Sequence, residues 1–527
     1  MPTQVSYPGV YIEEIPSGVR TIAGVATSIT AFVGRAPRGP TDADTDSPVV
    51  INSFGDYVRA FGDLWVDSAL GFAVRDFFLN GGAQALVVRL YHAPATGNSK
   101  ASLAVGVLTL TAAYPGSWGN NLRARVDHQT RPRPDGSADP DTFNLFVRDG
   151  ATGVIETFRN VSHLTTHPRR IDKVLENEST LVRAALPASR PAKHPDPQPS
   201  EDVWGDNTIA TNNKVLTAGE ASDGQALAKN DFISAAKEAA NQGLFTLRKA
   251  DLFNLLCVPP YTSTGDVDVD VVTQAAVLCE DRRAFLLVDP PSTWNDKNDP
   301  KVDFSAILGT DSKNAALFFP RLRQPNPVRD DQEEDFVPCG AVAGIFARTD
   351  AERGVWKAPA GLEARLVGVP KLSVPLTDAE NGELNPLGVN CLRTMPAAGR
   401  VVWGSRTMQG ADRLASEWKY VPVRRLALYL EESLYRGLQW VVFEPNDEPL
   451  WAQIRLNVGA FLQNLFRQGA FQGQTPRDAY FVKCDKETTT QNDIDLGIVN
   501  ILVGFAPLKP AEFVIIKLQQ MAGQIQT

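Results

Sequence analysis

The sequence predicts a mixed α/β protein of several domains: an α/β layer, an inserted mainly-β domain, and an α+β C-terminal domain with extended terminal arms. A strand–helix–strand pattern between residues 252 and 288 indicates adjacent parallel strands, as in an α/β sheet. The composition changes after His92, where short alternating strands and turns replace the helices. The chain has 527 residues, of which 43% are hydrophobic and 21% are charged, so it has room for about three globular domains.

The N-terminal part begins with an arm, residues 1–21, with prolines at positions 2, 8 and 16. The first half of the α/β domain, residues 22–95, then shows β-rich and helical patterns in alternation. We expect a strand at 25–33, helices at 54–60 and 69–79, and a strand at 84–91. This β-α-α-β order indicates an α/β layer rather than an all-β sandwich.

Residues 96–215 form the predicted insertion, which we interpret as an outer, mainly-β domain. Strands are expected at 103–111, 122–127, 143–148 and 154–158, the last two as a hairpin around Asp149-Gly150. The insertion carries 14 basic and 13 acidic residues, so it lacks the charge bias of a phosphate-binding module. A host-surface binding module is a possible role that would rest on this segment alone.

The α/β pattern resumes over residues 216–408, the second half of the same domain. Apolar runs predict parallel strands, and longer amphipathic runs predict the helices between them. Helices are expected at 232–242, 269–282 and 337–348, and strands at 252–258, 284–288 and 315–319.

Residues 409–506 form the predicted C-terminal domain, whose clearest feature is a pair of helical patterns. The first follows apolar residues from Leu426 to Leu438, and a short β-rich run, 439–443, comes next. The second steps by 3, 4, 3, 4, a seam suited either to a core or to a partner surface. Its residues are Trp451, Ile454, Val458, Phe461 and Leu465, with Arg455 on the polar flank. Gly469 is placed to end the helix.

Both chain ends carry β-favouring apolar runs. The C-terminal arm, residues 507–527, contains Phe513, Val514, Ile515, Ile516 and Leu518, and the N-terminal arm contains Val10, Tyr11 and Ile12. An unpaired apolar strand at a terminus promotes aggregation, so each run needs a sheet to join. Strand exchange between copies and pairing within one copy both satisfy that need.

Five motifs, in order, resemble the contractile tail sheath protein family. The similarity covers about residues 1–95 and 216–527 and excludes the insertion. The motifs are Tyr7–Glu14; Gly340–Gly344 with Arg348–Asp350 and Gly354–Gly361; Gly437–Trp440; Phe443–Trp451; and Pro510–Val514.

The resemblance implies a structural subunit of a phage tail or a phage-tail-like injection particle. It implies stacked hexameric rings around an inner tube, linked by exchanged arms, whose metastable extended state contracts to drive the tube through an envelope. The implied partners are other copies of the chain, the inner tube, baseplate and tail-terminator proteins. It also implies a subtilisin-like α/β layer, assembly in the bacterial cytoplasm and release by lysis.

An α/β hydrolase with an accessory β domain is the alternative, and the residues disfavour it. Asp289 and Ser292 follow a predicted strand, where α/β enzymes place catalytic groups. A triad needs a histidine base, and the five histidines, at 92, 128, 163, 167 and 194, avoid the second half of the α/β domain. The sequence has no Gly-x-Ser-x-Gly elbow and no nucleotide-binding Gly-x-x-x-x-Gly-Lys-Ser/Thr. We therefore predict no catalytic residues and no cofactor.

Metal, nucleic-acid and membrane sites are also disfavoured. His163 and His167 lack an intervening glutamate, and the series Asp266, Asp268, Asp270 is followed by valine where a calcium loop needs glycine. The five cysteines are dispersed and read as buried thiols. A net charge of −9 and a pI near 5.3 argue against nucleic acid, and neither a signal peptide nor a long apolar span is expected.

Overall fold

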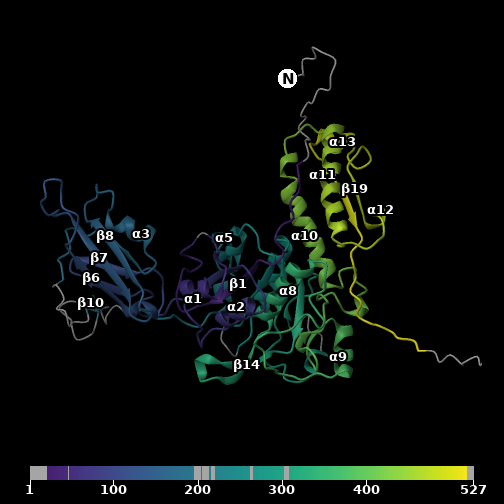
Figure 1. The fold of residues 1–527 in the computed structure, drawn as a ribbon, viewed down its shortest axis with the longest axis horizontal. Coiled ribbons are helices and arrows are strands. Elements are labelled where there is room, and N and C mark those ends of the chain that lie inside the picture. Colours follow the sequence, from purple (N-terminus) through teal and green to yellow (C-terminus); the bar gives the residue numbers. More distant parts are fainter. Residues whose placement is uncertain are drawn as a thin grey trace, which may run out of the picture. The chain divides into compact units, whose positions relative to one another are not determined.

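The computed structural model describes residues 20–45, 47–194, 203–204, 213–214, 220–261, 265–301 and 308–518, which form two compact units (Figure 1). The larger, here called the α/β unit, comprises Ser28–Arg348 and Pro359–Ser416. The smaller, here called the C-terminal unit, takes the described residues up to Thr27, Thr349–Ala358, and those from Glu417 onward. The segment Thr349–Ala358 therefore joins the C-terminal unit, although the sequence placed it in the α/β domain.

An eight-stranded sheet organises the α/β unit, in the order β18-β17-β13-β12-β11-β1-β3-β2. The run from β17 to β3 is parallel, and both edge strands are antiparallel. The inner strands from β13 to β3 are buried along their whole length, as expected for strands covered on both faces. The strands are β1 (Thr30–Arg35), β2 (Val49–Ile51), β3 (Ala85–Leu90), β11 (Leu255–Cys257), β12 (Phe285–Val288), β13 (Ala315–Phe319), β17 (Asn390–Met395) and β18 (Gly399–Val402).

The helices of this unit largely follow the predicted pattern. The expected helix at 232–242 is divided in two at Ile233-Ser234, where Ser234 caps the second piece by accepting from the Lys237 amide. A small antiparallel sheet of β14 (Leu322–Asn326), β15 (Gln332–Phe336) and β16 (Lys371–Leu372) was not predicted. The helices are α1 (Phe54–Phe61), α2 (Leu70–Leu79), α4 (Lys229–Phe232), α5 (Ala235–Ala240), α6 (Val269–Asp281), α8 (Cys339–Arg353) and α9 (Asp378–Leu384).

The motif Gly340–Gly344 has a packing role in helix α8. A Cβ on Gly340 would lie 2.0 Å from the Ala73 carbonyl oxygen of α2, and one on Gly344 would lie 2.4 Å from that of Phe77. The two helices thus approach to backbone contact, which only glycine allows. This part of the family motif fixes the interior of the unit and presents no functional group.

The insertion is an antiparallel β domain with its own apolar core. The predicted strand at 103–111 is a hairpin of β4 (Ser102–Val105) and β5 (Leu108–Ala112), because Gly106 takes a left-handed φ of 61° between them. The predicted hairpin around Asp149-Gly150 is present. The other elements are β6 (Leu122–Asp127), β7 (Thr142–Asp149), β8 (Ile155–Ser162), β9 (Val182–Ala184), β10 (Asn213–Lys214) and an unpredicted helix α3 (Ile171–Glu178).

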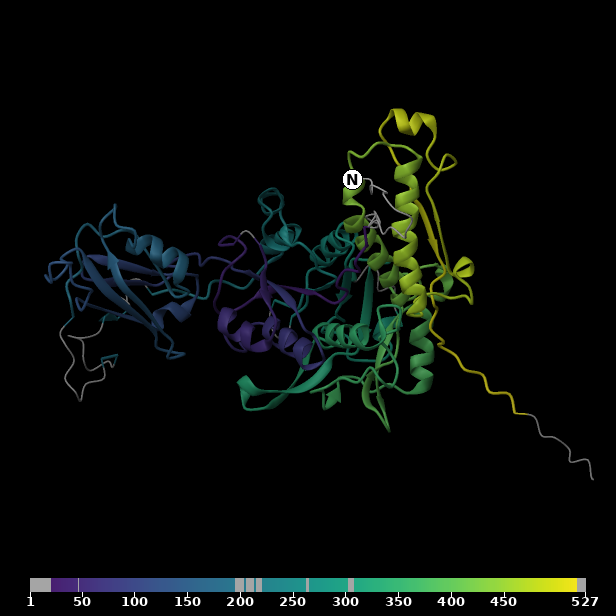
Figure 2. The same cartoon turned by 45° about the horizontal axis from the view of Figure 1, so that its top comes forward.

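Two helices, side by side in both views, form the frame of the C-terminal unit (Figures 1 and 2). Pro422 and Pro449 stand in the first turns of these helices, where a missing amide costs nothing, and Asp447 caps the second by accepting from the Leu450 amide. Gly469, at φ 79°, follows the end of the second helix as predicted. The elements are α10 (Val421–Gly437), α11 (Glu448–Arg467), α12 (Pro476–Ala479), β19 (Tyr480–Lys483), α13 (Gln491–Asp495) and β20 (Leu502–Phe505).

A buried ion pair and a strap hold the first helix of this unit. Arg425 of α10 makes a bidentate pair with Asp350, at 2.8 and 2.6 Å, and both side chains are nearly fully buried. The described chain begins at Arg20, whose guanidinium lies over the Trp440 ring, and Ile22 packs on Gly437. The strap from Arg20 to Thr27 therefore runs along α10.

One predicted strand of the C-terminal part is wrong, and the pairing of a second with another copy stays a prediction. The run at 439–443 is a 3₁₀ turn, η8 (Gln439–Val441), in the connection between α10 and α11. Its apolar residues had suggested β structure, but the connection is too short for a strand that could pair. The run Phe513–Leu518 forms no strand within the described chain and extends away from the C-terminal unit in both views.

Candidate assembly interface

The C-terminal arm leaves its own unit after residue 512. The bridge between Phe471 and Pro507 and the hydrogen bond from Tyr420 Oη to Glu512 Oε2, 3.1 Å, hold the first part of the arm to this unit. Beyond them the apolar side chains are almost fully exposed: Phe513 74%, Val514 81%, Ile515 81%, Ile516 78% and Leu518 93%. Five of the six residues from Phe513 to Leu518 are thus apolar side chains in water, interrupted only by Lys517, which makes this segment a candidate interface.

The C-terminal unit also holds an incomplete sheet. Strands β19 and β20 pair antiparallel, with Tyr480 opposite Phe505, and neither has another strand neighbour in the part of the chain that the structure describes. A two-stranded ribbon is marginal alone and here rests on α11. Its outer edges offer main-chain donors and acceptors to an added strand.

The predicted strand in the N-terminal arm, Val10, Tyr11 and Ile12, lies outside the described residues. The first described residue, Arg20, lies against Trp440. The described end of the N-terminal arm is therefore at the connection between α10 and α11.

The stripe on α11 lies in the core of the C-terminal unit. Its five apolar members are at most 6% exposed and pack with Leu426 and Leu430 of α10: Trp451, Ile454, Val458, Phe461 and Leu465. Arg455 is half-buried and donates to the Cys484 carbonyl and to Glu448. Of the two roles considered for this stripe, packing is the one these contacts describe.

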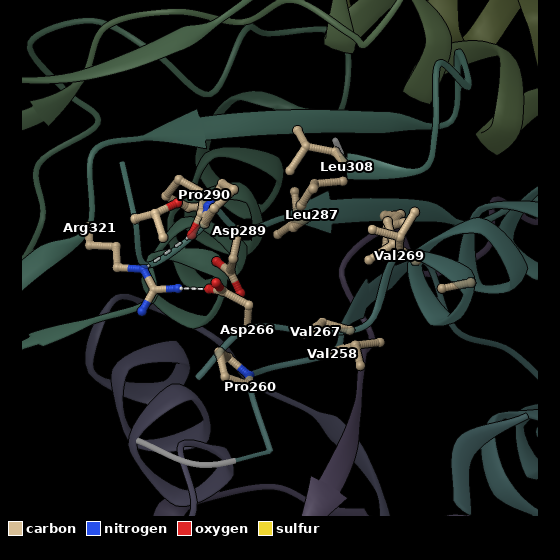
Figure 3. Close-up of a pocket in the computed structure, with 16 residues that line it drawn as sticks. Val258, Pro260, Asp266, Val267, Val269, Leu287, Asp289, Pro290, Leu308 and Arg321 are labelled. Atoms are coloured by element: carbon tan, nitrogen blue, oxygen red, sulfur yellow. Dashed lines mark hydrogen bonds and ion pairs between the residues drawn. The ribbon is translucent and has the colours of Figure 1, made fainter. Parts of the chain in front are cut away.

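A cavity of about 280 Å³ lies at the carboxyl ends of β11 and β12 in the α/β unit (Figure 3). Apolar residues such as Val258, Val288 and Leu308 line most of it. Asp289 Oδ1 accepts from the Cys339 amide at 2.9 Å, whereas Oδ2 is buried without a partner. Burial raises the pKa of Asp289 to about 7. A carboxyl with a pKa near neutrality at this end of a sheet is a candidate catalytic group.

The cavity lacks the other parts of a hydrolase site. Ser292 Oγ donates to Asp266 at 2.8 Å, and Asp266 in turn pairs with Arg321 at 2.6 Å, so the hydroxyl faces a neutralised carboxylate. No histidine lines the cavity. His92 contacts Asp231 at 2.8 Å instead. The serine therefore has no base, and the geometry offers no triad.

The other candidate sites have structural partners. Asp268 caps α6 and Asp270 pairs with Lys229 at 2.6 Å, so the acidic series does not converge on an ion. His163 and His167 precede α3 instead of sharing a helix face. The five cysteines are buried free thiols. Across the described residues there is no cluster of three possible metal ligands, and no helix long and apolar enough to cross a membrane.

Sequence comparison matches the two parts that carry these features. The profile of the phage tail sheath protein central domain matches residues 228–408, and that of the phage tail sheath C-terminal domain matches residues 415–520. The chain belongs to the contractile tail sheath family. Both matches lie within the regions whose motifs suggested it, and they leave the insertion out.

Curated sheath proteins share part of their length with this chain. The tail sheath protein of Vibrio phage KVP40 is 27% identical over 177 residues, 33% of this chain and 25% of the relative. The tail sheath protein of Enterobacteria phage T4 is 28% identical over 163 residues, 30% of this chain and 23% of the relative. A putative prophage major tail sheath protein of Pseudomonas aeruginosa is 26% identical over 247 residues, 46% and 59% of the two chains. The matches thus span between a quarter and three fifths of these sheath proteins.

Solved sheath structures share the fold over nearly the whole chain. An extracellular contractile injection system sheath complex, PVC, in the contracted state superposes with a TM-score of 0.58 at 23% identity, covering 98% of both chains. The sheath tail protein Lin1278 from Listeria innocua gives 0.59 at 15% identity, covering 93% and 96%. The multidomain α/β architecture is therefore that of known sheath subunits.

The connection between α10 and α11 was missed as a surface feature. Phe443 is fully exposed there at a left-handed φ of 71°. One signal could have found it: Phe443 stands in a family motif, and its neighbours Glu444-Pro445-Asn446-Asp447 are typical turn residues.

Proposed function

We propose that this sheath subunit polymerises as stacked hexameric rings around an inner tube and contracts to drive the tube through a target envelope. Its further partners are baseplate and tail-terminator proteins. The sheath assembles in the bacterial cytoplasm and leaves the cell by lysis, as part of a phage tail or an injection particle. The fold likeness to a PVC sheath complex and to chains of the anti-feeding prophage baseplate and helical sheath supports this.

The exposed arm is the observation that carries the proposal. Fully burying one Val, Leu, Ile or Phe side chain contributes about 1.5–3 kcal/mol, so leaving Phe513–Leu518 in water forgoes a large stabilisation. Addition of this segment to the open edge of β19 or β20 in another copy would bury its side chains and pair its main chain. Val10–Ile12 is proposed to act in the same way from the other end.

Such exchange fits contraction without chemistry. No histidine lines the cavity at Asp289. We attribute the work of contraction to a difference in contact free energy between two packings of the same subunits. Arms joined by main-chain hydrogen bonds would keep neighbours connected while the units rotate. In this proposal contraction needs no cofactor, and neither nucleic acid nor membrane insertion takes part.

We also infer a subtilisin-like arrangement for the α/β layer. The run of parallel strands from β17 to β3 and the helices between them support it. Asp289 follows β12 at the carboxyl ends of the strands, where α/β layers place catalytic groups, and no histidine lines its cavity.

Electron microscopy of the purified chain tests the proposal. The full-length protein should form ribbed tubes or rings, and deletion of residues 508–527 should leave a soluble, cooperatively folding monomer. Ile515→Pro should abolish tubes because proline removes a ladder donor, whereas the matched control Ile515→Ala keeps the donor and should retain short or sparse tubes. Discrete particles from the full-length chain, or a truncated chain that aggregates or melts far below wild type, would contradict strand exchange.

A further inference from the structure

The connection between α10 and α11 presents an aromatic side chain in a strained backbone. Phe443 is 102% exposed and has a φ of 71°. Among described non-glycine residues with positive φ it is the only aromatic one. Such a conformation is unfavourable for a bulky residue, and the water around the ring adds an apolar cost. Phe443, fully exposed, gains no packing within its own copy that would offset these two costs.

The connection is braced on both sides of Phe443. Asn446 Oδ1 accepts from Trp451 Nε1 at 2.9 Å, and Asn446 Nδ2 donates to the Ile498 carbonyl at 2.9 Å. Asp447 caps α11 directly behind it. These bonds fix the connection, so Phe443 is displayed in a set position, which lowers the entropy lost on binding.

Acidic side chains outnumber basic ones around Phe443, where Arg20, over the Trp440 ring, is a nearby cation. No lysine or arginine occurs between residues 437 and 454 or between 487 and 508, the two stretches that the bond from Asn446 to Ile498 brings together. Glu444 and Asp447 are exposed beside Phe443, and Val442 adds a further apolar side chain at 58% exposure. The complementary surface would be apolar with basic groups at its rim.

The outer face of the β19–β20 ribbon has that chemistry. Phe481 is 48% and Leu502 is 51% exposed, and Lys483 lies opposite Leu502 on the same face as Phe481. A Cβ on Gly504 would lie 2.1 Å from the Phe481 ring, so the ring lies flat on the glycine and forms a platform. Lys483 has no ion-pair partner in the described part of the chain.

We propose that Phe443 and Glu444 of one copy dock on the ribbon face of a second copy, with Phe443 on Phe481 and Leu502, and Glu444 paired with Lys483. The full exposure of Phe443 shows that it does not reach the ribbon of its own copy. Because two different surfaces pair, the contact is heterologous and repeats without closing on a dimer, as a ring or helix requires. The inference deepens the proposed self-assembly: it adds a side-chain contact beside the exchanged strands.

Cysteine cross-linking in the full-length chain tests the contact directly. The five native cysteines are buried, so a short bifunctional thiol reagent should react with introduced cysteines. A mixture of Glu444→Cys and Lys483→Cys chains should give covalent dimers, and each variant alone should give none. A mixture of Glu444→Cys with the control Leu456→Cys, which is exposed on α11, should also give none. Assembled protein without the cross-link would overturn the contact and leave the proposed sheath function standing.

Assembly measurements on substitution variants give a second test. Phe443→Asn, which tolerates the left-handed backbone, should raise the concentration needed for assembly by about tenfold or more, while the thermal midpoint stays the same or rises. Leu456→Ala should change the concentration needed for assembly by less than about twofold. Glu444→Lys should weaken assembly, and Glu444→Lys with Lys483→Glu should restore it.

The outcomes separate the possible occupants. A Phe443→Asn chain that self-assembles normally but no longer binds the inner tube protein would overturn the proposal in favour of the tube. If the unmodified chain forms no tubes or rings, the proposed function fails. In that case the cross-link between Glu444→Cys and Lys483→Cys chains is measured at high protein concentration. If no cross-link forms there, the docking contact is overturned as well.

Discussion

The stripe on α11 and the C-terminal arm are both apolar, yet one lies inside the protein and the other in water. Trp451, Ile454 and Val458 are at most 2% exposed, whereas Ile515 and Ile516 are about 80% exposed. The stripe repeats at helical spacing, so a second helix, α10, can cover it within the same unit. The arm is apolar on successive residues, so both faces of any strand it forms need a neighbour, and its own unit supplies neither. Helical periodicity thus lets one chain bury its own apolar stripe, whereas the arm lacks such a pattern, and under the proposed strand exchange a second copy would cover it.

The largest expected effect is that of Trp451→Ala, which tests whether the stripe on α11 is core. We expect a loss of about 3–5 kcal/mol in the free energy of unfolding, because a large buried ring is removed and its Nε1 bond to Asn446 is lost. Chemical denaturation would measure it. The matched control is Leu456→Ala on the exposed side of α11, for which we expect less than about 0.5 kcal/mol. Similar values for both variants would mean that the stripe is not the core.

The carboxyl of Asp289 gives an interior effect that depends on pH. Its pKa in the folded chain is about 7, above the unfolded value near 4, so the folded state binds the extra proton between these limits. Stability therefore falls as pH rises through this window, by roughly 2–4 kcal/mol at pH 8. Asp289→Asn should remove this pH-dependent loss of folding stability. The variant should therefore become more stable than wild type as pH rises, and its assembly should be unchanged.

Thermal melts of both proteins between pH 4 and pH 8 would measure this difference. The exposed Asp63→Asn variant serves as the control. Parallel stability curves for Asp289→Asn and wild type would contradict the burial of the Asp289 carboxyl. Loss of contraction by well-folded, normally assembled Asp289→Asn would instead reveal a functional role at the cavity.

The arm should show the opposite behaviour to the stripe. Ile516→Thr should change the free energy of unfolding of the monomer by less than about 0.5 kcal/mol, because the side chain contacts water there. It should weaken assembly in part, since the main-chain ladder remains. Light scattering beside denaturant melts would separate the two readouts. A melting loss comparable to that of Trp451→Ala would show that the arm pairs within its own subunit.

The smallest expected effect on assembly comes from the insertion. Asn98, near its start, bridges Ala221, a few residues beyond its end, and the Asn98 carbonyl accepts from the Ser222 amide at 3.0 Å. Replacing residues 96–215 with a short Gly-Ser linker should therefore still give tubes by electron microscopy. Arg89 loses its bond to the Pro115 carbonyl, so a modest drop in thermal midpoint is expected. Unfolded or purely monomeric product would show that assembly needs the insertion.

The sequence by itself determined the elements whose pattern is local. The βαβ unit from β11 to β12, the seam on α11, the close of that helix at Gly469 and the absence of a histidine near Asp289 follow from spacing and composition. The same holds for the family, because its motifs are runs of neighbouring residues. These features depend on main-chain geometry and side-chain size, which the sequence states directly.

Only the tertiary structure decided which apolar residues find partners. The run at 439–443 looked like a strand, but a short braced connection holds it as a turn and displays Phe443. The motif Gly340–Gly344 became a contact between α2 and α8, and Thr349–Ala358 passed to the C-terminal unit through the pair of Asp350 with Arg425. Burial depends on residues far apart in the chain, and local spacing cannot encode it.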